Sequence, residues 1–412
     1  MSDPATIDHA MTNAAWLDRY QGSLLNVFGR PQLVLEHGDG AWVWDVEGRR
    51  YLDLVGGIAV NALGHNHPAL VAAVSKQAGQ LVHVSNFFTS VPQVELAERL
   101  LSLAGAPAGS KVFFCNSGAE ALEAAIKLAR RTGRTGIVAA EGAFHGRTTG
   151  ALALTHKPSY RAPFEPLIPG VTHVPWGDID ALRAAVTEQT SALVLEPIQG
   201  EAGVRPGSSH YLRAAREITR DAGALLVLDE VQTGIGRTGT WFAFHQAGIA
   251  PDAITLAKGL GGGVPIGALM TFGPEVSTML TPGQHGSTFG GNPLACAAGL
   301  AVLDAIAAEG LLDHAREAGE HLGHRVGTLN HPQVTGIRGA GLLQAITLAG
   351  DSAAAVATLA RDAGFLVNPV APNTIRLAPP LVVTTDELDL FLDALPGLLD
   401  AATATATAKD AR

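Results

Sequence analysis

The sequence predicts an α/β fold in which a mostly parallel sheet is flanked by helices, together with a smaller α+β domain. Short, nearly continuous apolar runs recur along the middle of the chain, and such runs are typical of strands covered on both faces. Segments with helical spacing of apolar residues lie between them, and alternating strands and helices form parallel sheets. The 412 residues are enough for two domains.

The N-terminal segment, residues 1–61, is predicted to be a small antiparallel piece, because turn residues such as Gly38, Gly40 and Gly48 separate its short apolar runs. Residues 62–309 are predicted to form the large domain. Its strands are expected at 111–115, 137–140, 171–174, 192–195, 224–228 and 254–257. Its helices are expected around 122–129 and 212–218, where apolar residues recur at helical spacing.

Residues 310–400 are predicted to form the smaller α+β domain together with the N-terminal segment. A helix is expected near 356–363, and a last helix is opened by the capping box of Thr384 and Glu387. Residues 401–412 have low complexity and are predicted to be a flexible tail.

Composition and charge limit the function classes. Charged residues make up 16% of the chain, below the usual share of roughly 25%, which indicates that much of the surface is covered, as in an oligomer. The formal net charge of -10 argues against nucleic acid or an anionic membrane as the main partner. No apolar run is long enough to span a membrane, and no signal peptide is visible. With only two cysteines, Cys115 and Cys296, a cytoplasmic location is expected.

A lysine at the end of one predicted strand is the central candidate for chemistry. Lys258 stands where an apolar run meets four glycines at 259 and 261–263. Burial there would lower the pKa of the lysine and make its amine nucleophilic, as Schiff-base formation with an aldehyde requires. Three interpretations fit: a surface lysine after a strand, a dinucleotide-binding glycine loop, and a pyridoxal phosphate lysine. Pro265 disfavours the second, because it blocks the helix that such a loop needs.

The pyridoxal phosphate interpretation predicts partners elsewhere in the chain. Asp229 follows another predicted strand, where its carboxylate could pair with a protonated pyridine nitrogen and keep the ring electron-withdrawing. Gln232 could donate a hydrogen bond to the ring hydroxyl. Taken alone, Asp229 is better explained as a turn cap. Its place at a strand end, 29 residues before Lys258, favours the cofactor role.

A glycine-bearing turn after the predicted strand 111–115 could bind a phosphate. Ser117, Gly118 and Ala119 open a helix there, and a helix N-terminus offers backbone donors and a positive dipole end to an anion. Ser117 and Glu120 also form a capping box, which alone would explain both residues.

A second turn, at 286–293, has hydroxyl groups at Ser287 and Thr288 among glycines. It could supply a further phosphate contact. An ordinary loop that ends in a helix beginning at Pro293 explains it equally well.

Aromatic and histidine residues near the predicted strand ends are less specific. Phe144 could stack on a cofactor ring, although an isolated phenylalanine is more often part of a core. His145 beside it is ambiguous and is left out of the catalytic set. His65 and His67 are interpreted as polar turn residues, because no third ligand is spaced nearby, and no metal site is predicted.

From about residue 20 to residue 395, the chain resembles the class III pyridoxal-phosphate-dependent aminotransferases. The stretches that carry the resemblance are 56–68, 116–121, 144–148, 196–203, 228–239, 256–265, 285–293 and 375–380. The resemblance implies the fold type I architecture of PLP-dependent transferases and pyridoxal 5'-phosphate as cofactor. It also implies a homodimer with its active sites at the subunit interface.

The resemblance further implies roles for individual residues. Lys258 and Asp229 would be the catalytic residues, one bound to the cofactor aldehyde and the other paired with the ring nitrogen. The remaining cofactor-binding residues would be Ser117, Gly118, Ala119, Phe144, Val231, Gln232 and, from the other subunit, Thr288. The substrate-binding residues would be Arg147, Glu201, Ser287 and Arg376.

The implied activity is an amino transfer in arginine biosynthesis. The terminal amine of N2-acetyl-L-ornithine would be removed, leaving N-acetyl-L-glutamate 5-semialdehyde, and 2-oxoglutarate would accept it and become L-glutamate. Arg376 would bind the α-carboxylate of glutamate, and Glu201 would neutralise Arg376 when the terminal amine is bound. Arg147 would bind the distal carboxylate through two hydrogen bonds. Glu201 and Arg376 could instead form a purely structural ion pair.

Other substrates are alternatives within the same chemistry: ornithine, succinylornithine, succinyldiaminopimelate and 4-aminobutyrate. Leu122 and Phe88 depart from the common family pattern, in which asparagine and tyrosine are frequent, so the rim of the substrate pocket stays open. Two alternatives come from other classes. Pro265 disfavours a nicotinamide dehydrogenase, and the intact Lys258 and Asp229 disfavour a non-catalytic paralogue.

Overall fold

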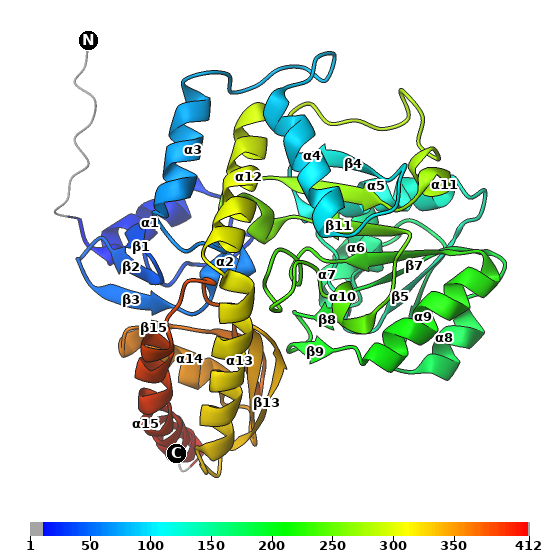
Figure 1. The fold of residues 1–412 in the computed structure, drawn as a ribbon. Helices are drawn as coiled ribbons and strands as arrows, with labels where there is room; N and C mark the ends of the chain where they lie inside the picture. The colour runs from blue at the N-terminus through cyan, green and yellow to red at the C-terminus, as the bar shows by residue number, and fades with distance from the viewer. Residues whose placement is uncertain (1–10, 411–412) are drawn as a thin grey trace.

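A seven-stranded sheet lies at the centre of the large part of the chain, as the computed structural model shows for the described residues 11–410 (Figure 1). Its strands follow the spatial order β4, β12, β11, β10, β7, β5, β6. Their bounds are β4 Lys111–Cys115, β5 Gly136–Ala140, β6 Val171–Val174, β7 Thr190–Leu195, β10 Leu225–Asp229, β11 Ala253–Leu256 and β12 Gly267–Thr271. Only β12 is antiparallel to its neighbours among these described strands, which confirms the predicted mostly parallel sheet.

Helices cover both faces of this sheet. On one face, α9 (Ser209–Ala222) packs in the same core as Leu193 and Leu226, and on the other, α5 (Gly118–Arg130) packs with Val194. Successive residues of one strand therefore point to opposite, equally apolar faces. The other helices of this part are α3 Pro68–Ala78, α4 Val91–Leu103, α6 Thr149–Leu154, α7 Pro158–Arg161, α8 Ile179–Ala185, α10 Phe244–Ala247, α11 Pro274–Ser277 and α12 Pro293–Ala308.

Both ends of the chain build the smaller α+β part (Figure 1). Near the N-terminus, α1 (Asn13–Ser23) precedes the antiparallel strands β1 (Leu35–Asp39), β2 (Trp42–Asp45) and β3 (Arg50–Asp53), and α2 (Gly56–Ala59) follows them. The short strand β15 (Phe365–Leu366) joins β3 in parallel. The expected α+β architecture is therefore present, while the domain boundaries at residues 61, 309 and 400 stay predictions.

The second small sheet comes from the C-terminal part of the chain and has the order β13, β14, β17, β16. Its strands are β13 Val334–Ala340, β14 Leu343–Leu348, β16 Asn368–Ala371 and β17 Thr374–Leu377, and the accompanying helices are α13 Leu311–Thr328, α14 Ala353–Asp362 and α15 Thr385–Asp410. The capping box that opens α15 is confirmed. The Thr384 N–H donates to Glu387 Oε2 at 2.8 Å, and the Glu387 N–H donates to Thr384 Oγ1 at 3.2 Å.

The flexible tail expected at residues 401–412 stays a prediction. Residues 401–410 continue helix α15, which runs from Thr385 to Asp410. Ala402 is only 2% exposed, and alanine has the highest helix propensity, so packing and propensity both extend the helix. Residues 411–412 of the expected tail, like residues 1–10, lie outside the described residues.

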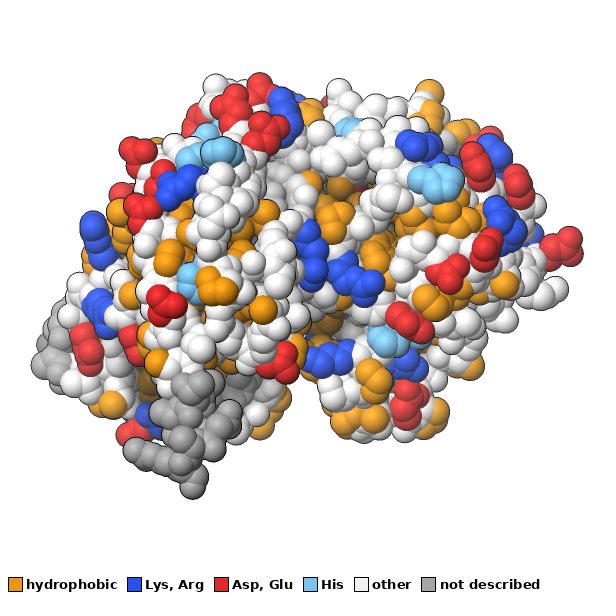
Figure 2. All heavy atoms as spheres, turned by 90° about the horizontal axis from the view of Figure 1, so that it is seen from below, with side chains coloured by type: hydrophobic (Ala, Val, Ile, Leu, Met, Phe, Trp, Pro, Cys, Tyr) orange, Lys and Arg blue, Asp and Glu red, His pale blue; other side chains and the backbone are white. Residues whose placement is uncertain are grey.

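No single helix among residues 11–410 is long and apolar enough to cross a membrane. Within that range, α12 and α13 have the required length and composition only as a pair, which is bent by 66° at the junction. Figure 2 shows one face of the molecule, on which acidic and basic side chains are interspersed around a hollow between two lobes.

Candidate active site

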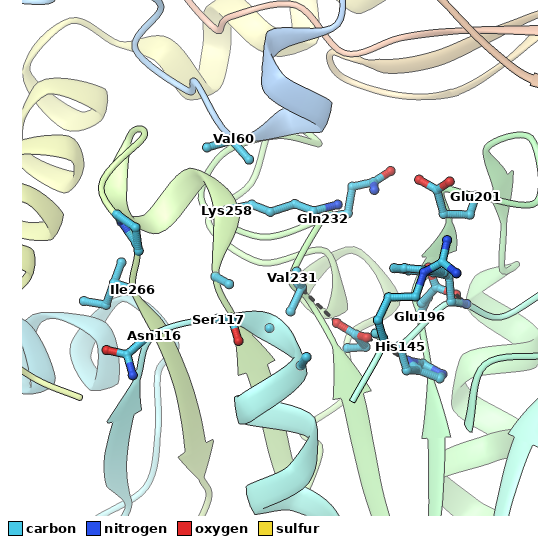
Figure 3. Close-up of a pocket in the computed structure, with 18 of the residues that line it drawn as sticks. Val60, Asn116, Ser117, His145, Glu196, Glu201, Val231, Gln232, Lys258 and Ile266 are labelled. Carbon is cyan, nitrogen blue, oxygen red and sulfur yellow. Dashed lines mark hydrogen bonds and ion pairs between the residues drawn. The ribbon is translucent and has the colours of Figure 1, made fainter. Parts of the chain in front are cut away.

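A cavity of about 440 Å³ gathers most of the predicted site residues (Figure 3). It is bounded by the segments that follow β4, β5, β7, β10 and β11, and α/β folds bind ligands at this end of their parallel strands. The predicted residues that line it are Ser117, Gly118, Ala119, Phe144, Arg147, Glu201, Asp229, Val231, Gln232 and Lys258.

Lys258 stands directly beyond the end of β11. It begins the 3-10 turn Lys258–Gly261 with a φ of 42°, a left-handed conformation that costs a non-glycine residue about 1–2 kcal/mol. Burial and the nearby Arg376 lower the pKa of Lys258 to about 8, although the carboxylates of Glu201 and Asp229 act in the opposite direction. A lowered pKa is what the sequence predicts for a lysine that is buried at the end of a strand.

The surroundings of Lys258 exclude the dinucleotide interpretation. No α-helix follows the glycines; the 3-10 turn leads through Pro265 into the strand Gly267–Thr271. The Lys258 side chain extends towards Gln232, with Glu201 beyond it (Figure 3). Its ammonium group has no hydrogen bond or ion pair in the part of the chain that the structure describes. Lys258 is therefore free to react.

Asp229 is the last residue of β10. Its Oδ1 accepts hydrogen bonds from the Val231 N–H at 3.0 Å and from the Thr255 hydroxyl at 3.2 Å, and its Oδ2 lies 2.7 Å from His145 Nδ1. Burial disfavours a charge on His145, but the hydrogen bond and the charge of Asp229 raise the pKa of His145 above its ordinary value. The carboxylate is thus fixed in orientation from three sides.

The turn that opens α5 offers an anion site. Ser117 caps the helix, and its Oγ accepts a hydrogen bond from the Glu120 N–H at 3.2 Å, which is half of the predicted capping box. The Glu120 carboxylate accepts from the Asn116 N–H at 3.0 Å and not from that of Ser117. The N–H groups of Gly118 and Ala119 have no partner among residues 11–410 and lie at the positive end of the helix. Position 118 requires glycine, because an added Cβ would lie 2.9 Å from both methyl carbons of Val231.

Phe144 and Arg147 reach the cavity from the loop after β5. The Phe144 N–H donates to Glu196 Oε2 at 3.1 Å. The guanidinium carbon of Arg147 lies 3.6 Å from the centre of the Tyr160 ring and 5.6 Å from the centre of the Phe144 ring. Arg147 makes no hydrogen bond or ion pair within the described residues. Its N–H donors are therefore available to a carboxylate.

Arg376 does not line the cavity itself but forms an ion pair with Glu201, which does. Arg376, on β17, is 2% exposed, and its Nη1 donates to Glu201 Oε1 at 2.5 Å and to Gln232 Oε1 at 3.3 Å. Burial disfavours the charge of Glu201, but Arg376 lowers the pKa of Glu201 below its ordinary value. Glu201 is partly exposed but Arg376 is buried, so removing Glu201 leaves a buried charge without its ionic partner. A group that displaces Glu201 from Arg376 must therefore be anionic.

Ser287 and Thr288 do not line this cavity. Ser287 Oγ accepts a hydrogen bond from Asn116 Nδ2 at 3.0 Å, and Asn116 lines the cavity, so Ser287 lies one residue behind its wall. Thr288 is exposed on the loop before α12. Its contact with a phosphate across a subunit interface stays a prediction.

Two buried titratable residues of the cavity, Glu196 and His145, were not in the predicted set. Burial raises the pKa of Glu196 to about 7. The rule that singles out Asp229, a polar residue at the carboxyl end of a buried strand, applies equally to Glu196, which follows β7. No local sequence pattern indicates the contact between His145 and Asp229, because the two residues are 84 positions apart.

Family comparison agrees with this arrangement. The family model described as Aminotransferase class-III matches residues 27–399, a range that contains every site residue described above. The chain belongs to the class-III aminotransferases. The expected fold class is thereby confirmed, and the cavity with Lys258 is the candidate active site of a class-III aminotransferase.

Individual class-III aminotransferases are similar to this chain over nearly its full length. Acetylornithine aminotransferase of Streptomyces coelicolor is 57% identical over 397 residues, 96% of this chain and 98% of that protein. The crystal structure of acetylornithine aminotransferase from Elizabethkingia anophelis has a TM-score of 0.84 at 35% identity and covers 94% of this chain and 98% of its own. An ornithine aminotransferase structure from Toxoplasma gondii, with partial occupancy of PLP at its active site, has a TM-score of 0.90 at 31% identity, with coverages of 96% and 95%.

Proposed function

We propose that this class-III aminotransferase transfers the terminal amino group of N2-acetyl-L-ornithine to 2-oxoglutarate in arginine biosynthesis, with PLP as cofactor. The products are N-acetyl-L-glutamate 5-semialdehyde and L-glutamate. Similarity to acetylornithine aminotransferases at 57% identity supports the choice of amine. The structural observation that carries the proposal is the Arg376–Glu201 pair beside Lys258, because it can present either a buried cation or a neutral pair to the substrate.

The residues present fit PLP. The free N–H groups of Gly118 and Ala119 suit a phosphate, and Asp229, held beside His145, suits a protonated ring nitrogen. The unpaired amine of Lys258 suits an aldehyde. When bound, the cofactor supplies the aldehyde that takes up the amino group and a ring that withdraws electrons from the reacting carbon.

Lys258 moves the proton in this scheme. Its pKa of about 8 is well below the ordinary value of about 10.4, so a substantial fraction of the amine is neutral near neutral pH. The neutral Nζ accepts a proton from the substrate carbon that carries the amino group, and the resulting ammonium donates it back on the other side of the transferred nitrogen.

The two half-reactions make opposite demands on Arg376. Glutamate carries an α-carboxylate next to its reacting carbon, and this carboxylate replaces Glu201 as the partner of Arg376. The terminal amine of acetylornithine carries no anion at that point, so Glu201 stays and neutralises Arg376. Arg147, with its free donors, binds the carboxylate that both substrates have at the far end.

A homodimer is part of the proposal. Large apolar side chains are exposed on the isolated chain, among them Leu25 at 84%, Phe28 at 89% and Phe87 at 91%. Extended apolar patches are uncommon on monomers and indicate a binding surface. Phe289, next to Thr288, is also 60% exposed. We expect this loop to lie at the interface, where Thr288 would reach the phosphate site of the other subunit. The cytoplasmic location expected from the sequence stays a prediction.

A substrate panel tests the proposed function. Purified, PLP-loaded protein is assayed for glutamate formation from 2-oxoglutarate with acetylornithine, ornithine, succinylornithine, succinyldiaminopimelate and 4-aminobutyrate. We expect the highest kcat/KM with acetylornithine; a higher value with another amine would replace the proposed substrate. Lys258→Ala should fold and show no turnover, and retained turnover would exclude Lys258 as the reacting amine.

A further inference from the structure

We propose that Tyr160 is a positioning residue that holds Arg147 ready for the distal carboxylate of the substrate. Tyr160 lies on the short helix α7 (Pro158–Arg161), outside the family-derived set of site residues, and does not line the cavity itself. The inference rests on the proposed function, because it takes Arg147 as the residue that binds the distal carboxylate.

The contact between the two side chains is close and is the main restraint on Arg147. The guanidinium carbon lies 3.6 Å from the centre of the Tyr160 ring, well within the distance of a cation–π interaction. Within residues 11–410, Arg147 has no hydrogen bond or ion pair that could orient it instead. Since Arg147 is exposed, an unrestrained side chain would lose rotamer freedom on binding a carboxylate. Stacking on a ring restricts that freedom in advance and leaves the N–H groups unused.

Tyr160 is itself held in place from two sides. The Phe144 ring meets it edge to face, with a centroid distance of 6.3 Å and an interplanar angle of 83°. Arg161, the next residue, lies with its Nη1 3.4 Å from His173 Nδ1 on β6, which ties the end of α7 to the central sheet. The ring is therefore a fixed support between the residue proposed to stack on the cofactor and the residue proposed to bind the substrate.

The backbone between Phe144 and Arg147 adds a second constraint. Gly146 has a φ of 135°, and an added Cβ would lie 2.9 Å from Ala119 Cβ and 3.0 Å from Ala151 Cβ. The loop is thus packed tightly against α5 and α6. With its base fixed, the Arg147 side chain lines the cavity, and the Tyr160 ring is its nearest aromatic contact there.

Lys157 offers a competing explanation. Its Nζ lies 4.7 Å from the centre of the same ring, and this exposed ammonium could bind the carboxylate in place of Arg147. Lys157→Gln separates the two possibilities, because it removes this cation and leaves both the ring and Arg147 in place.

Calorimetric binding of an unreactive ligand tests the proposal without relying on turnover. The first ligand is N-acetyl-L-norvaline, which is acetylornithine without its terminal amine. The second ligand is the carboxamide of N-acetyl-L-norvaline, which lacks the charge of the carboxylate. Each is titrated into PLP-loaded wild type, Tyr160→Leu, Tyr160→Phe, Lys157→Gln and Arg147→Ala. We expect Tyr160→Leu to raise the Kd of the acid about 2- to 5-fold, the range of one cation–π contact at an exposed site, and to leave the Kd of the amide unchanged. Tyr160→Phe should restore most of the wild-type affinity for the acid, since a phenyl ring also attracts a cation.

Each other outcome contradicts part of the proposal. Equal loss of acid and amide binding in Tyr160→Leu would show a general packing role, and no loss would show that Arg147 needs no support. A loss of acid binding in Lys157→Gln as large as that in Arg147→Ala would assign the carboxylate to Lys157. The visible absorption of the bound cofactor and the Tm verify that each variant is folded; should Tyr160→Leu fail this check, Tyr160→Gln gives the same comparison.

The same titrations distinguish failure of this inference from failure of the proposed function. The wild type could turn over acetylornithine and prefer the acid to the amide, while Tyr160→Leu binds both ligands as the wild type does. That result would exclude only the proposed role of Tyr160. If the wild type binds acid and amide equally, Arg147 does not bind the carboxylate, and the substrate orientation in the proposed function falls together with this inference.

Discussion

The pKa of Lys258, the proposed reacting amine, depends on neighbours from several separate segments of the chain. Burial and Arg376 lower its pKa, while Glu201, Asp229 and Glu196 raise it. The sequence predicts Lys258 and Asp229 because both lie at strand ends, where the fold gathers them. It does not predict the ring contact of Arg147 with Tyr160, because that contact depends on how a short helix packs beside the loop after β5.

The capture of PLP by the apoprotein should report the pKa of Lys258. Only the neutral amine attacks an aldehyde, so the rate should rise about tenfold per pH unit below pH 8 and level off above it. Arg376→Gln removes a cation that lowers this pKa, and the inflection should move to higher pH. Stopped-flow absorption measures the rate, with Arg205→Gln, a change to an exposed arginine outside the cavity, as control. A wild-type rate that still rises at pH 10 would contradict a lowered pKa.

Glu201→Ala should shift the preference of the enzyme towards α-amino substrates. Without Glu201, the buried Arg376 lacks its ionic partner, so a substrate carboxylate gains a strong attraction there and a terminal amine leaves the cation unpaired. We expect the ratio of kcat/KM for glutamate to that for acetylornithine to rise about 10-fold or more. Half-reactions followed by cofactor absorption give both values. An unchanged ratio would make the pair a purely structural one.

At the level of elements, the apolar runs predict six strands of the central sheet with end shifts of at most two residues. The seventh strand, β12, is not predicted from the sequence. Its apolar run, Gly267–Thr271, follows the glycine-rich turn and Pro265 so closely that it is not recognised as a separate element. The hairpin β8 (Ile198–Gln199) and β9 (Arg205–Pro206) also escapes, because strands of two residues carry no periodic pattern.

The turn of that hairpin carries Glu201, and Arg338 on β13 ties it to the smaller domain. Arg338 Nε donates to the Gly203 carbonyl at 2.9 Å and to the Val204 carbonyl at 3.1 Å, where Val204 has a φ of 51°. Arg376 lies in the same sheet, on β17. One sheet therefore fixes both members of the ion pair.

Arg338→Ala should loosen the turn and partly reproduce the effect of Glu201→Ala. Losing these partly buried hydrogen bonds costs roughly 1 kcal/mol, so we expect a shift of about 3- to 5-fold in the same kcat/KM ratio. The neighbouring exposed Arg205 serves as a matched control, since Arg205→Ala removes a cation of the same turn without these hydrogen bonds. Equal effects of the two variants would point to charge and not to the hydrogen bonds of Arg338.

At the level of the whole molecule, the resemblance to one family supplies what local patterns do not, namely how the terminal segments join. The pairing of β15 with β3 links residues that no helical or strand periodicity relates. The continuation of α15 beyond residue 401 is not visible in local patterns for a related reason, because the burial of Ala402 comes from packing against other parts of the chain. The exposed apolar side chains cannot be located from the sequence, since exposure depends on the complete fold.

Charged substitutions on the exposed apolar surface should separate the subunits. Phe28→Asp and Phe87→Asp each place a charge where a homodimer would bury an aromatic ring, and we expect the dimer to dissociate at least about 10-fold more readily. Analytical ultracentrifugation measures the change, and activity should fall with the dimer if Thr288 completes the other site. Leu390→Asp, on α15, is the control. A wild-type monomer with full activity would contradict the expected dimer.

The parallel pairing of β3 with β15 determines when the enzyme can become active during its synthesis. Leu52 pairs with Phe365, so the first small sheet lacks one edge until the ribosome has translated almost the whole message. The strands of the central sheet lie between residues 111 and 271, and the turn that carries Lys258 packs against α12, which ends at residue 308. Arg376 emerges only after β15. The residues that hold Lys258, the proposed reacting amine, are therefore translated before Arg376, the proposed α-carboxylate site, so the proposed choice of substrate would be acquired last.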